Sequence, residues 1–529
     1  ETTDVGELSK QQVEALSGIK SQFEEKDVIL LHGVTGSGKT RVYIELIQEA
    51  LDKGEQVLYL LPEIALTAQI VQRLQKIFGD KIAVYHSRMN NHERVELWKA
   101  TRKTQGIILA ARSGIFLPYE NLKLIIVDEE HDPSFKQNDP APRYNARDTA
   151  VFMAHLHQAK VLLGTATPSL ETYRNTLTGK YGLVNMHERF GGLELPAVHL
   201  ADMKEETKKK TMQSIFTTQL LDELKAALGR GEQAILFQNR RGYAPTLHCK
   251  RCEWKSGCIH CDVSLTYHKF THKLSCHYCG YRENVPEECP ACGNAQIEMR
   301  GFGTEKIEDE LQIYLPKAKI ARMDWDTVKG KKALTKLIND FEEKRIDILV
   351  GTQMVTKGLD FDNVGVVGIL SADQLIYFPD FRASERAYQL MVQVSGRAGR
   401  KYKQGKVVIQ TYQVDHPVIK DVLANDFENF KLRELNERKQ FNYPPFQRMI
   451  KITLKHKKRM TCYQAAELFA KALKKRLGGR VVGPAEPGIP RIRSLYHQDI
   501  MIKLENKSQV LNSTKDLIRT TQNEVQKTK

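Results

Sequence analysis

A stretch near the N-terminus has the residue types and spacing that bind a triphosphate. Residues 33–40 read GVTGSGKT, which fits the phosphate-loop pattern G-x-x-x-x-G-K-[ST]. Its glycines let consecutive backbone N–H groups turn inward around phosphates, and the N-terminus of a following helix adds positive potential. An apolar strand before the loop and a helix after it favour this interpretation over a simple glycine-rich turn. We therefore expect nucleotide contacts from Gly33, Val34, Thr35, Gly36, Ser37, Gly38, Lys39 and Thr40.

Four side chains have the chemistry that triphosphate hydrolysis needs. Lys39 supplies a positive charge for the β- and γ-phosphates, and the Thr40 hydroxyl can ligate Mg²⁺. In LIIVDEEH (residues 124–131) an apolar strand ends at Asp128, placed to hold the metal through its hydration shell. Glu129 follows, placed to polarise the attacking water. An acidic loop at a helix start is the alternative, but the apolar run and the upstream phosphate loop favour hydrolysis of ATP with Mg²⁺.

Two arginines lie three residues apart in a later stretch. Residues 393–400 read QVSGRAGR, late in what we interpret as a second α/β unit. Phosphoryl transfer spreads charge over the γ-phosphate, and an arginine from a facing lobe can stabilise that charge. We expect this role for Arg397 and Arg400, although the pattern alone is also compatible with a solvated arginine- and glycine-rich turn.

Eight of the nine cysteines form four C-x-x-C pairs between residues 249 and 292. One tight turn with this spacing offers two thiolates to one tetrahedral ion, so eight ligands make two Cys₄ zinc sites. Disulfides are one alternative, but they are rare in cytosolic proteins. Redox-active pairs are another, but four of them without a thioredoxin-like βαβ unit are atypical. Four thiolates leave no open position for water, so we expect structural metals that supply the folding energy of this segment.

The apolar pattern supplies two series of strands that would position these motifs. Short apolar runs begin at residues 28, 56, 106, 122 and 160 and alternate with longer amphipathic stretches. This alternation indicates a parallel α/β sheet. A second series begins at residues 233, 346, 364 and 406, and the cysteine pairs interrupt it. After about residue 415 the pattern changes to strands and helices of a small α+β domain.

The fold class that we predict is therefore α/β, with two tandem α/β lobes, a cysteine-rich two-zinc insertion in the second lobe and a small α+β C-terminal domain. We place the first lobe at residues 1–230 and the second at 231–246 and 295–414. The zinc insertion takes residues 247–294 and the C-terminal domain residues 415–529.

The charge balance points to a polyanionic partner. The chain of 529 residues has 80 Lys and Arg against 64 Asp and Glu, a net charge of +16. Nucleic acid is the leading candidate partner for such a protein, and a solvated basic surface is the alternative. No apolar run approaches the roughly 18 residues of a membrane span, and we find no secretory signal. We expect a cytoplasmic protein that does not bind membranes.

The order of the motifs resembles that of superfamily 2 helicases. The motifs that match the first lobe are LSKQQ (8–12), GVTGSGKT, PEIALTAQ (62–69), ARSGIFLP (111–118), DEEH and GTATPS (164–169). Those that match the second are FQNRRGYAP (237–245), GFGTEKIEDEL (301–311), GTQMVTKGLDF (351–361) and QVSGRAGR. DEEH, FQNRRGY, an eight-cysteine insertion and GFGTEK together closely resemble the PriA family of bacterial primosomal replication-restart helicases. This resemblance covers essentially the whole chain, and it implies that the two tandem lobes are RecA-like P-loop lobes.

The resemblance implies an ATP-dependent 3′-to-5′ DNA helicase that recognises and remodels stalled or repaired forks and initiates primosome assembly for replication restart. Its implied partners are single-stranded and forked DNA, a single-stranded DNA-binding protein and helicase-loading proteins of the primosome. By the same resemblance Gln12 contacts adenine, and Gly358 and Asp360 couple nucleotide state to closure of the lobes. Family members begin with a 3′-end-binding domain and a winged-helix domain, and we expect this chain to start after both.

Two other functions remain open at this point. The ATPase could act as a DNA-dependent translocase or switch without strand separation. Alternatively, the chain could mainly be an assembly platform, with zinc and C-terminal surfaces that recruit partners.

The spacing of the cysteine pairs suggests how they share two Zn²⁺ ions. Fourteen residues separate the second and third pairs, which suits a zinc ribbon. The first and fourth pairs would then close around them, an arrangement that the family resemblance supports. The two predicted ligand sets are Cys249, Cys252, Cys289 and Cys292, and Cys258, Cys261, Cys276 and Cys279.

The segment after DEEH mixes aromatic and basic residues. Residues 131–148 read HDPSFKQNDPAPRYNARD. Aromatic faces can stack on bases while cations follow the phosphates of a single strand. A proline-stiffened surface loop is the alternative. In the resembled family the matching loop links single-stranded DNA binding to hydrolysis, so we expect DNA contacts from Phe135, Lys136, Arg143, Tyr144 and Arg147.

Overall fold

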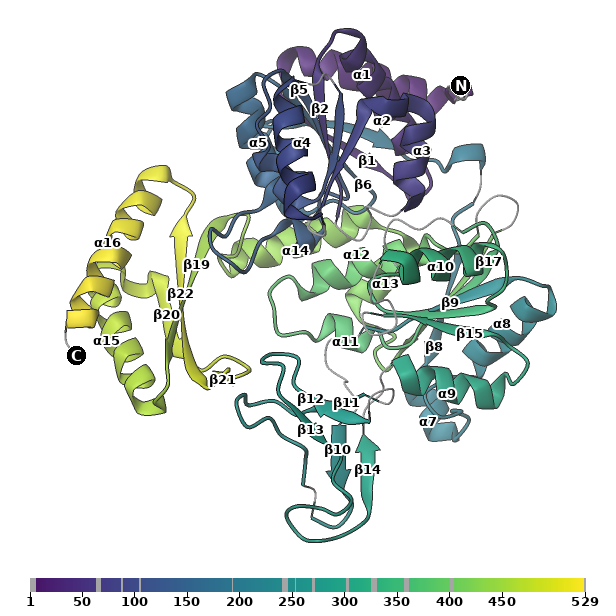
Figure 1. The fold of residues 1–529 in the computed structure, drawn as a ribbon, viewed down its shortest axis with the longest axis vertical. Helices are drawn as coiled ribbons and strands as arrows, with labels where there is room; N and C mark the ends of the chain where they lie inside the picture. The colour runs from purple at the N-terminus through teal and green to yellow at the C-terminus, as the bar shows by residue number, and fades with distance from the viewer. Residues whose placement is uncertain are drawn as a thin grey trace. The chain divides into compact units, whose positions relative to one another are not determined.

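The computed structural model (Figure 1) describes most of the chain. The described residues are 6–62, 68–86, 89–103, 106–192, 194–239, 246–252, 254–268, 272–300, 304–324, 331–355, 361–399 and 404–527. They divide into two compact units, one from residues 1–239 and 310–431 and the other from residues 240–309 and 432–529.

The first unit contains a seven-stranded sheet whose order is β3-β4-β2-β5-β6-β1-β7. All of its strand pairs are parallel. The strands are β1 (Val28–Gly33), β2 (Gln56–Leu60), β3 (Ile82–Tyr85), β4 (Ile107–Ala110), β5 (Leu122–Asp128), β6 (Lys160–Thr165) and β7 (Gly182–Met186). The accompanying helices are α1 (Lys10–Glu25), α2 (Lys39–Asp52), α3 (Ala68–Phe78), α4 (Asn91–Lys103), α5 (Ala146–His157) and α6 (Leu170–Leu177).

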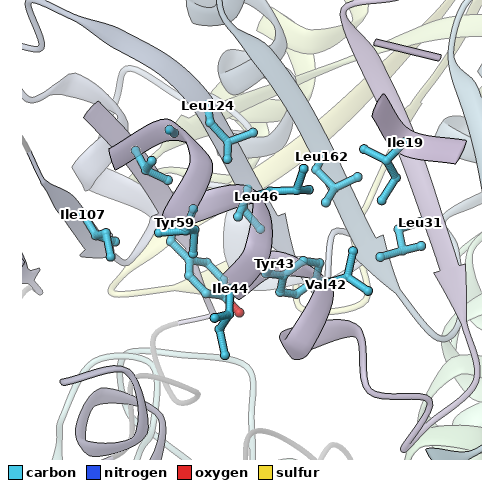
Figure 2. Packing of buried hydrophobic residues seen from close by; sticks show 14 of the residues in the cluster. Ile19, Leu31, Val42, Tyr43, Ile44, Leu46, Tyr59, Ile107, Leu124 and Leu162 are labelled. Atoms are coloured by element: carbon cyan, nitrogen blue, oxygen red, sulfur yellow. The ribbon is translucent and has the colours of Figure 1, made fainter. Parts of the chain in front are cut away.

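Successive side chains of the strands enter two separate cores, one on each face of this sheet. Ile29 and Leu31 of β1 pack with α1 and α2, whereas Val28 and Leu30 pack with α5. Side chains alternate between the two faces of a strand, so a strand covered on both faces has a continuous apolar run. Figure 2 shows the first of these cores, with Tyr43 among its members.

A second parallel sheet in the same unit has the order β15-β16-β9-β17-β18-β8. Its strands are β8 (Ala197–Asp202), β9 (Gln233–Phe237), β15 (Ile320–Met323), β16 (Ile348–Gly351), β17 (Val364–Ile369) and β18 (Lys406–Thr411). The helices of this region are α7 (Met203–Lys209), α8 (Thr218–Gly229), α10 (Lys331–Glu342), α11 (Asp373–Ile376), α12 (Ala383–Ser395) and α13 (Pro417–Ala424). Two further helices, α9 (Thr304–Tyr314) and α14 (Phe427–Gln440), each contain residues of both units. The predicted pair of tandem parallel lobes is confirmed.

Two lobe boundaries differ from the predicted ones. β8 pairs with β18, so the second sheet includes a strand at residues 197–202, which we had assigned to the first lobe. β8 lies at the edge of the sheet and is only partly buried, so it lacks the apolar run that marks a central strand. The second difference is α13, which packs on α12 in the first unit although we had placed residues 415–431 in the C-terminal domain.

The second unit combines the cysteine-rich region with the C-terminal α+β domain. In the cysteine-rich region β10 (Thr246–Cys249) pairs with β14 (Ile297–Arg300), and a three-stranded antiparallel sheet forms beside them. That sheet consists of β11 (Thr266–His268), β12 (Lys273–Ser275) and β13 (Arg282–Asn284). The C-terminal domain contains β19 (Gln447–His456), β20 (Val481–Ala485), β21 (Arg491–Ile492), β22 (Leu495–Glu505), α15 (Arg459–Leu477) and α16 (Ser508–Lys527).

The C-terminal sheet buries one face against its helices. Ile500, Ile502 and Leu504 alternate along β22 and enter one core with Phe469 and Leu473 of α15. This period of two is the pattern of a strand that is buried on one face. Among the described residues, no helix is long and apolar enough to cross a membrane.

Candidate functional site

The predicted phosphate loop connects β1 to α2. Gly36 and Gly38 have φ angles of +78° and +85°, a region that residues with a Cβ rarely adopt. Lys39 is the first residue of α2, and its Nζ donates to the carbonyl of Gly33 at 2.7 Å and to that of Val34 at 3.3 Å. The loop therefore has the strand–turn–helix form that lets backbone N–H groups and one ammonium group face a phosphate chain.

The side chain of Gln12 on α1 is hydrogen-bonded to this loop. Its side chain is 1% exposed, and its Nε2 donates to the carbonyl of Gly38 at 3.3 Å. Its Oε1 accepts from the backbone N–H of Ser9 at 2.9 Å, as part of a capping box at the start of α1. The structure thus places Gln12 against the phosphate loop, where both ends of its amide group already have protein partners.

Asp128 ends β5 next to two buried tyrosines. Its carboxylate oxygens accept from the Tyr43 hydroxyl at 3.1 Å and from the Tyr59 hydroxyl at 3.3 Å. Figure 2 shows the two tyrosines side by side, with ring centroids 5.7 Å apart. Burial, with the Asp128 charge as a smaller cause, raises the pKa of both phenols well above 10, so they remain hydrogen-bond donors. These two donors orient Asp128, and our sequence analysis did not identify them.

The charge of Asp128 is costly in this position. Burial, and then the neighbouring charge of Glu129, raise the pKa of Asp128 to about 6, although Lys39 acts in the opposite direction. A bound cation would stabilise the ionised carboxylate, as expected for a residue that serves Mg²⁺. The electrostatics of the site therefore fit the predicted metal role.

Glu129 links the first lobe to the second. Its Oε2 accepts from Nε2 of Gln393 on α12 at 3.2 Å. The same Gln393 nitrogen lies 2.8 Å from His131 Nε2, and His131 Nδ1 lies 2.7 Å from the Thr165 hydroxyl. If Gln393 donates to Nε2, His131 carries its proton on Nδ1 and donates to Thr165. Glu129 has a φ of +53°, a region that residues with a Cβ rarely adopt and that is found at functional sites.

The QVSGRAGR turn approaches the phosphate loop at Gly396. A Cβ built on Gly396 would lie 2.5 Å from the Thr35 hydroxyl, so only glycine allows this close contact. Arg397 follows directly and is partly buried. The structure thus brings the Arg397 segment to the phosphate loop. The predicted site residues Gly358, Asp360 and Arg400 lie outside the described residues.

Arg189 is a further residue of this seam that sequence reasoning missed. It is 5% exposed, and its Nη1 donates to the carbonyls of Glu194 and Gly399, both at 3.1 Å. A Cβ on Gly36 would lie 3.2 Å from its Nε. The guanidinium group therefore lies between the phosphate loop and the QVSGRAGR turn. The surrounding sequence HERFGG matches no spacing rule, so only the fold reveals this position.

The structure directs two of the residues predicted to contact DNA toward the interior of the protein. Phe135 is 1% exposed and belongs to the core of the first lobe, so its ring packs against core side chains and not against a base. Arg147 pairs with the buried Glu130 at 3.0 Å and donates to the Ser169 hydroxyl at 2.6 Å. Both residues are directed inward because residues 131–148 pack against the first lobe. Arg147 lies on α5, next to Ser169 of the GTATPS motif.

The other three predicted DNA contacts lie nearer the surface. Lys136 and Arg143 are exposed, and Arg143 Nε donates to the carbonyl of Asn138 at 2.8 Å. Tyr144 is partly buried and packs edge-on against the exposed Phe116, with ring centroids 4.8 Å apart. These residues are placed where a nucleic acid strand could reach them.

The eight clustered cysteines form the two predicted sets. The Sγ atoms within each set all lie within 4.8 Å of one another. Sγ pairs are 3.6 Å apart in the first set, between Cys249 and Cys292, and 3.5 Å apart in the second, between Cys258 and Cys279. Four thiolates at about 2.3 Å from a tetrahedral Zn²⁺ would be about 3.8 Å apart. All nine cysteines are free thiols, and the two sets fit Zn²⁺.

Family models match four successive parts of the chain. They are "DEAD/DEAH box helicase" over residues 9–176, "PriA DNA helicase Cys-rich region (CRR) domain" over 258–283, "Helicase conserved C-terminal domain" over 302–402 and "Primosomal protein N C-terminal domain" over 439–529.

Curated relatives match nearly the whole chain. Replication restart protein PriA of Bacillus subtilis is 41% identical over 524 residues, which cover 98% of this chain and 65% of that protein. The proteins of the same name from Chlamydia muridarum and Rickettsia conorii are 40% and 38% identical. These matches cover 94% and 95% of this chain, and 67% and 76% of those proteins. The chain thus spans about two thirds of the length of these relatives.

Proposed function

The chain belongs to the PriA family of replication restart proteins, and on this premise we propose that it is an ATP-hydrolysing DNA helicase. One observation carries the proposal: Gln393 of the second lobe contacts Glu129, the predicted water-polarising residue of the first lobe, at 3.2 Å. A movement of the second lobe would therefore act directly on the catalytic carboxylate. Such coupling between a hydrolytic site and a lobe movement is what a translocating enzyme requires.

We assign the following roles to the residues of the site. The backbone of the loop from Gly33 to Thr40 and the Lys39 ammonium bind the triphosphate, and Gln12 holds the loop or the adenine. Thr40 and Asp128 hold Mg²⁺. ATP supplies the phosphoryl group whose transfer to water releases free energy.

Other residues act on the water and on the lobes. Glu129 orients and polarises the attacking water, and Gln393 fixes the position of that carboxylate. Arg397 and Arg400 reach the γ-phosphate from the second lobe. Gly358 and Asp360 couple the state of the nucleotide to closure of the lobes.

On DNA, we propose 3′-to-5′ movement and the remodelling of stalled or repaired forks for primosome assembly. Lys136 and Arg143 would follow the phosphates of a single strand. The net charge of +16 supports a polyanionic substrate. A single-stranded DNA-binding protein and helicase-loading proteins are the proposed protein partners, and the cytoplasm is the proposed location.

The proposal is tested by comparing the wild-type protein with a Lys39→Ala variant. ATP hydrolysis is measured with and without single-stranded DNA, and unwinding is measured on forks with either a 3′ or a 5′ single-stranded arm. We expect single-stranded DNA to stimulate the wild type, and Lys39→Ala to lower hydrolysis by about 100-fold or more. Lys53→Ala at the other end of the same helix, where the side chain is exposed, is the matched control.

Each result has a clear meaning. Unwinding of only the fork with the 3′ arm supports the proposed polarity. DNA-stimulated hydrolysis without unwinding of either fork would instead indicate a translocase. Hydrolysis that persists in Lys39→Ala would contradict the proposed nucleotide site.

A further inference from the structure

A hairpin of the C-terminal domain reaches the second cysteine set. β21 and the start of β22 pair at Arg491 with Tyr496 and at Ile492 with Leu495, which leaves a two-residue tip of Arg493 and Ser494. More than 200 residues of sequence separate this tip from the cysteines it contacts.

The tip donates a hydrogen bond to a sulfur of the second cysteine set. The backbone N–H of Arg493 lies 3.1 Å from the Sγ of Cys261. Other cysteines of these sites receive such a bond from within their own turns, for example Cys258 from the N–H of His260 at 3.4 Å. Cys279 likewise receives one from Tyr281 at 3.5 Å. The partner of Cys261 is therefore unusual, because it comes from a different domain.

The Arg493 side chain joins the two halves of the same site. Its Nε donates to the carbonyl of Tyr278 at 2.9 Å, and Tyr278 lies between Cys276 and Cys279. The backbone of Arg493 thus contacts one C-x-x-C turn while its guanidinium group contacts the other.

Neighbouring residues of the hairpin add further contacts. Arg491 Nε donates to the carboxylate of Asp262 at 2.9 Å, and the N–H of Asp262 donates to the carbonyl of Arg491 at 2.8 Å. The N–H of Ser494 donates to the carbonyl of His260 at 2.7 Å. Ile492 packs on the small core that contains Cys261. The tip is therefore a complementary surface with polar and apolar contacts.

The backbone of the tip is held in a costly conformation. Arg493 and Ser494 have φ angles of +51° and +60°, and neither is glycine. Residues with a Cβ rarely adopt this region, and where they do the surrounding contacts hold them there. Such a tip fits a surface that must meet a fixed partner.

We propose that this hairpin tip is an outer-shell part of the second metal site and that metal binding there docks the C-terminal domain. Four thiolates around one Zn²⁺ leave a net negative charge at the site, which N–H donors and nearby arginines stabilise. The metal in turn fixes the two C-x-x-C turns at the spacing that Arg493 bridges. The two events therefore stabilise each other, independently of nucleotide hydrolysis.

The first test measures how firmly the protein holds its zinc. A double variant, Arg491→Ala with Arg493→Ala, is treated with a zinc-binding dye, and the release of each of the two ions is followed. We expect one ion to leave about 10-fold faster than in the wild type and the other to leave unchanged, since outer-shell partners have effects of about 10- to 100-fold on metal affinity. Arg459→Ala, which breaks an exposed ion pair with Glu486 in the same domain, is the control. Unchanged release of both ions would overturn the proposal.

A second variant separates the contribution of Arg493 from that of Arg491. Replacing Arg493 and Ser494 by Asn and Gly keeps both N–H donors and suits the positive φ angles, but it removes the guanidinium group. We expect this variant to release zinc at a rate between those of the wild type and the double variant. A rate equal to that of the wild type would show that the Arg493 guanidinium group does not stabilise the metal site, and would contradict this part of the proposal.

The reverse effect is measured on the wild-type protein, which avoids any variant that fails to fold. Amide hydrogen exchange is compared with bound zinc and after the zinc is removed. We expect residues 491–496 to lose protection on zinc removal while the central part of α15 keeps it. If residues 491–496 keep their protection, the metal does not dock the hairpin and the proposal is wrong.

Discussion

The Asp128 carboxylate shows how a functional residue opposes stability. It is partly buried beside Glu129, and desolvation followed by the Glu129 charge raises its pKa from the ordinary value of 3.8 to about 6. The folded state therefore binds this proton more tightly than the unfolded state does. At pH 7 the ionised group lowers the free energy of unfolding, and this penalty disappears as the pH falls through about 6 toward 3.8.

An Asp128→Asn variant removes this penalty. We expect its free energy of unfolding to exceed that of the wild type by about 1–3 kcal/mol at pH 7. The difference should shrink as the pH is lowered through about 6, because the wild-type carboxyl then becomes neutral in the folded state. Urea unfolding without Mg²⁺ at several pH values measures this. A difference that grows toward low pH would show that the sign of the pKa shift is wrong.

Phe135 is expected to act on stability rather than on DNA binding. Its ring is buried in the core of the first lobe, and Phe→Ala changes in cores cost about 3–5 kcal/mol. We expect Phe135→Ala to lower the free energy of unfolding by this amount, as measured by urea denaturation. A stable variant that has lost DNA stimulation of hydrolysis would contradict this account.

The exposed residues Lys136 and Arg143 are expected to act on DNA binding and not on stability. We expect Lys136→Ala combined with Arg143→Ala to leave unfolding unchanged and to weaken binding of single-stranded DNA. The salt dependence of binding should also become less steep, because each lost phosphate contact removes about 0.7 from the slope. Binding measured over a range of salt concentrations checks this. An unchanged slope would exclude these two cations from the DNA path.

These cases show which site residues the sequence can reveal. Lys39 and Asp128 could be predicted as site residues because local spacing defines their chemistry, and the strand before each of them is apolar. The inward orientation of Phe135 and Arg147 was not predicted, because their neighbours along the chain do not show whether they face the core. Arg189 and Tyr59 were missed for the same reason, since only the folded chain brings them to the site.

At the scale of elements, a side chain of α12 in the second lobe accepts a hydrogen bond from the N-terminus of α6 in the first lobe. The first N–H groups of a helix lack partners within that helix, and at α6 the N–H of Leu170 donates to Oε1 of Glu385 on α12 at 2.8 Å. Arg382 also pairs with Glu171 of α6. This contact joins the GTATPS motif to the helix that ends in the QVSGRAGR turn.

A pair of substitutions at Glu385 tests this contact. Glu385→Ala leaves a buried N–H without its acceptor, and we expect it to lower the free energy of unfolding by about 1–3 kcal/mol. Glu385→Gln keeps an acceptor oxygen and should cost clearly less. Both values come from denaturant titration. Equal losses in the two variants would mean that the hydrogen bond to Leu170 is not the source of the effect.

The elements themselves were predicted to different degrees. Central strands such as β1 and β5 are buried on both faces, and their continuous apolar runs identified them. The edge strand β8 has no such run. We therefore placed the end of the first lobe at residue 230, although the second sheet already includes residues 197–202. The two cysteine sets followed from C-x-x-C spacing, whereas the hairpin tip that contacts Cys261 left no local signal.

At the scale of the whole molecule, each of the two compact units is built from two separate stretches of the sequence. Residues 240–309, which interrupt the sequence of the second lobe, belong to one unit with residues 432–529. Residues 310–431 belong to the first unit. The first unit has its own large apolar cores on both faces of a sheet. The cysteine-rich region has a core with few buried members, namely Leu247, Leu265, Leu274, Cys258, Cys261 and Cys276.

This difference predicts what removal of zinc should do. A region whose small core consists partly of metal ligands depends on the metal for its folding, while the first unit does not. After treatment with a chelator that prefers Zn²⁺ to Mg²⁺, we expect the cysteine-rich region to lose protection from amide exchange. Basal ATP hydrolysis in excess Mg²⁺ should stay within about twofold of its starting value, because local unfolding need not spread between compact units. Added Zn²⁺ should restore the protection. Hydrolysis that falls in step with zinc release would show that the first unit depends on the metal sites.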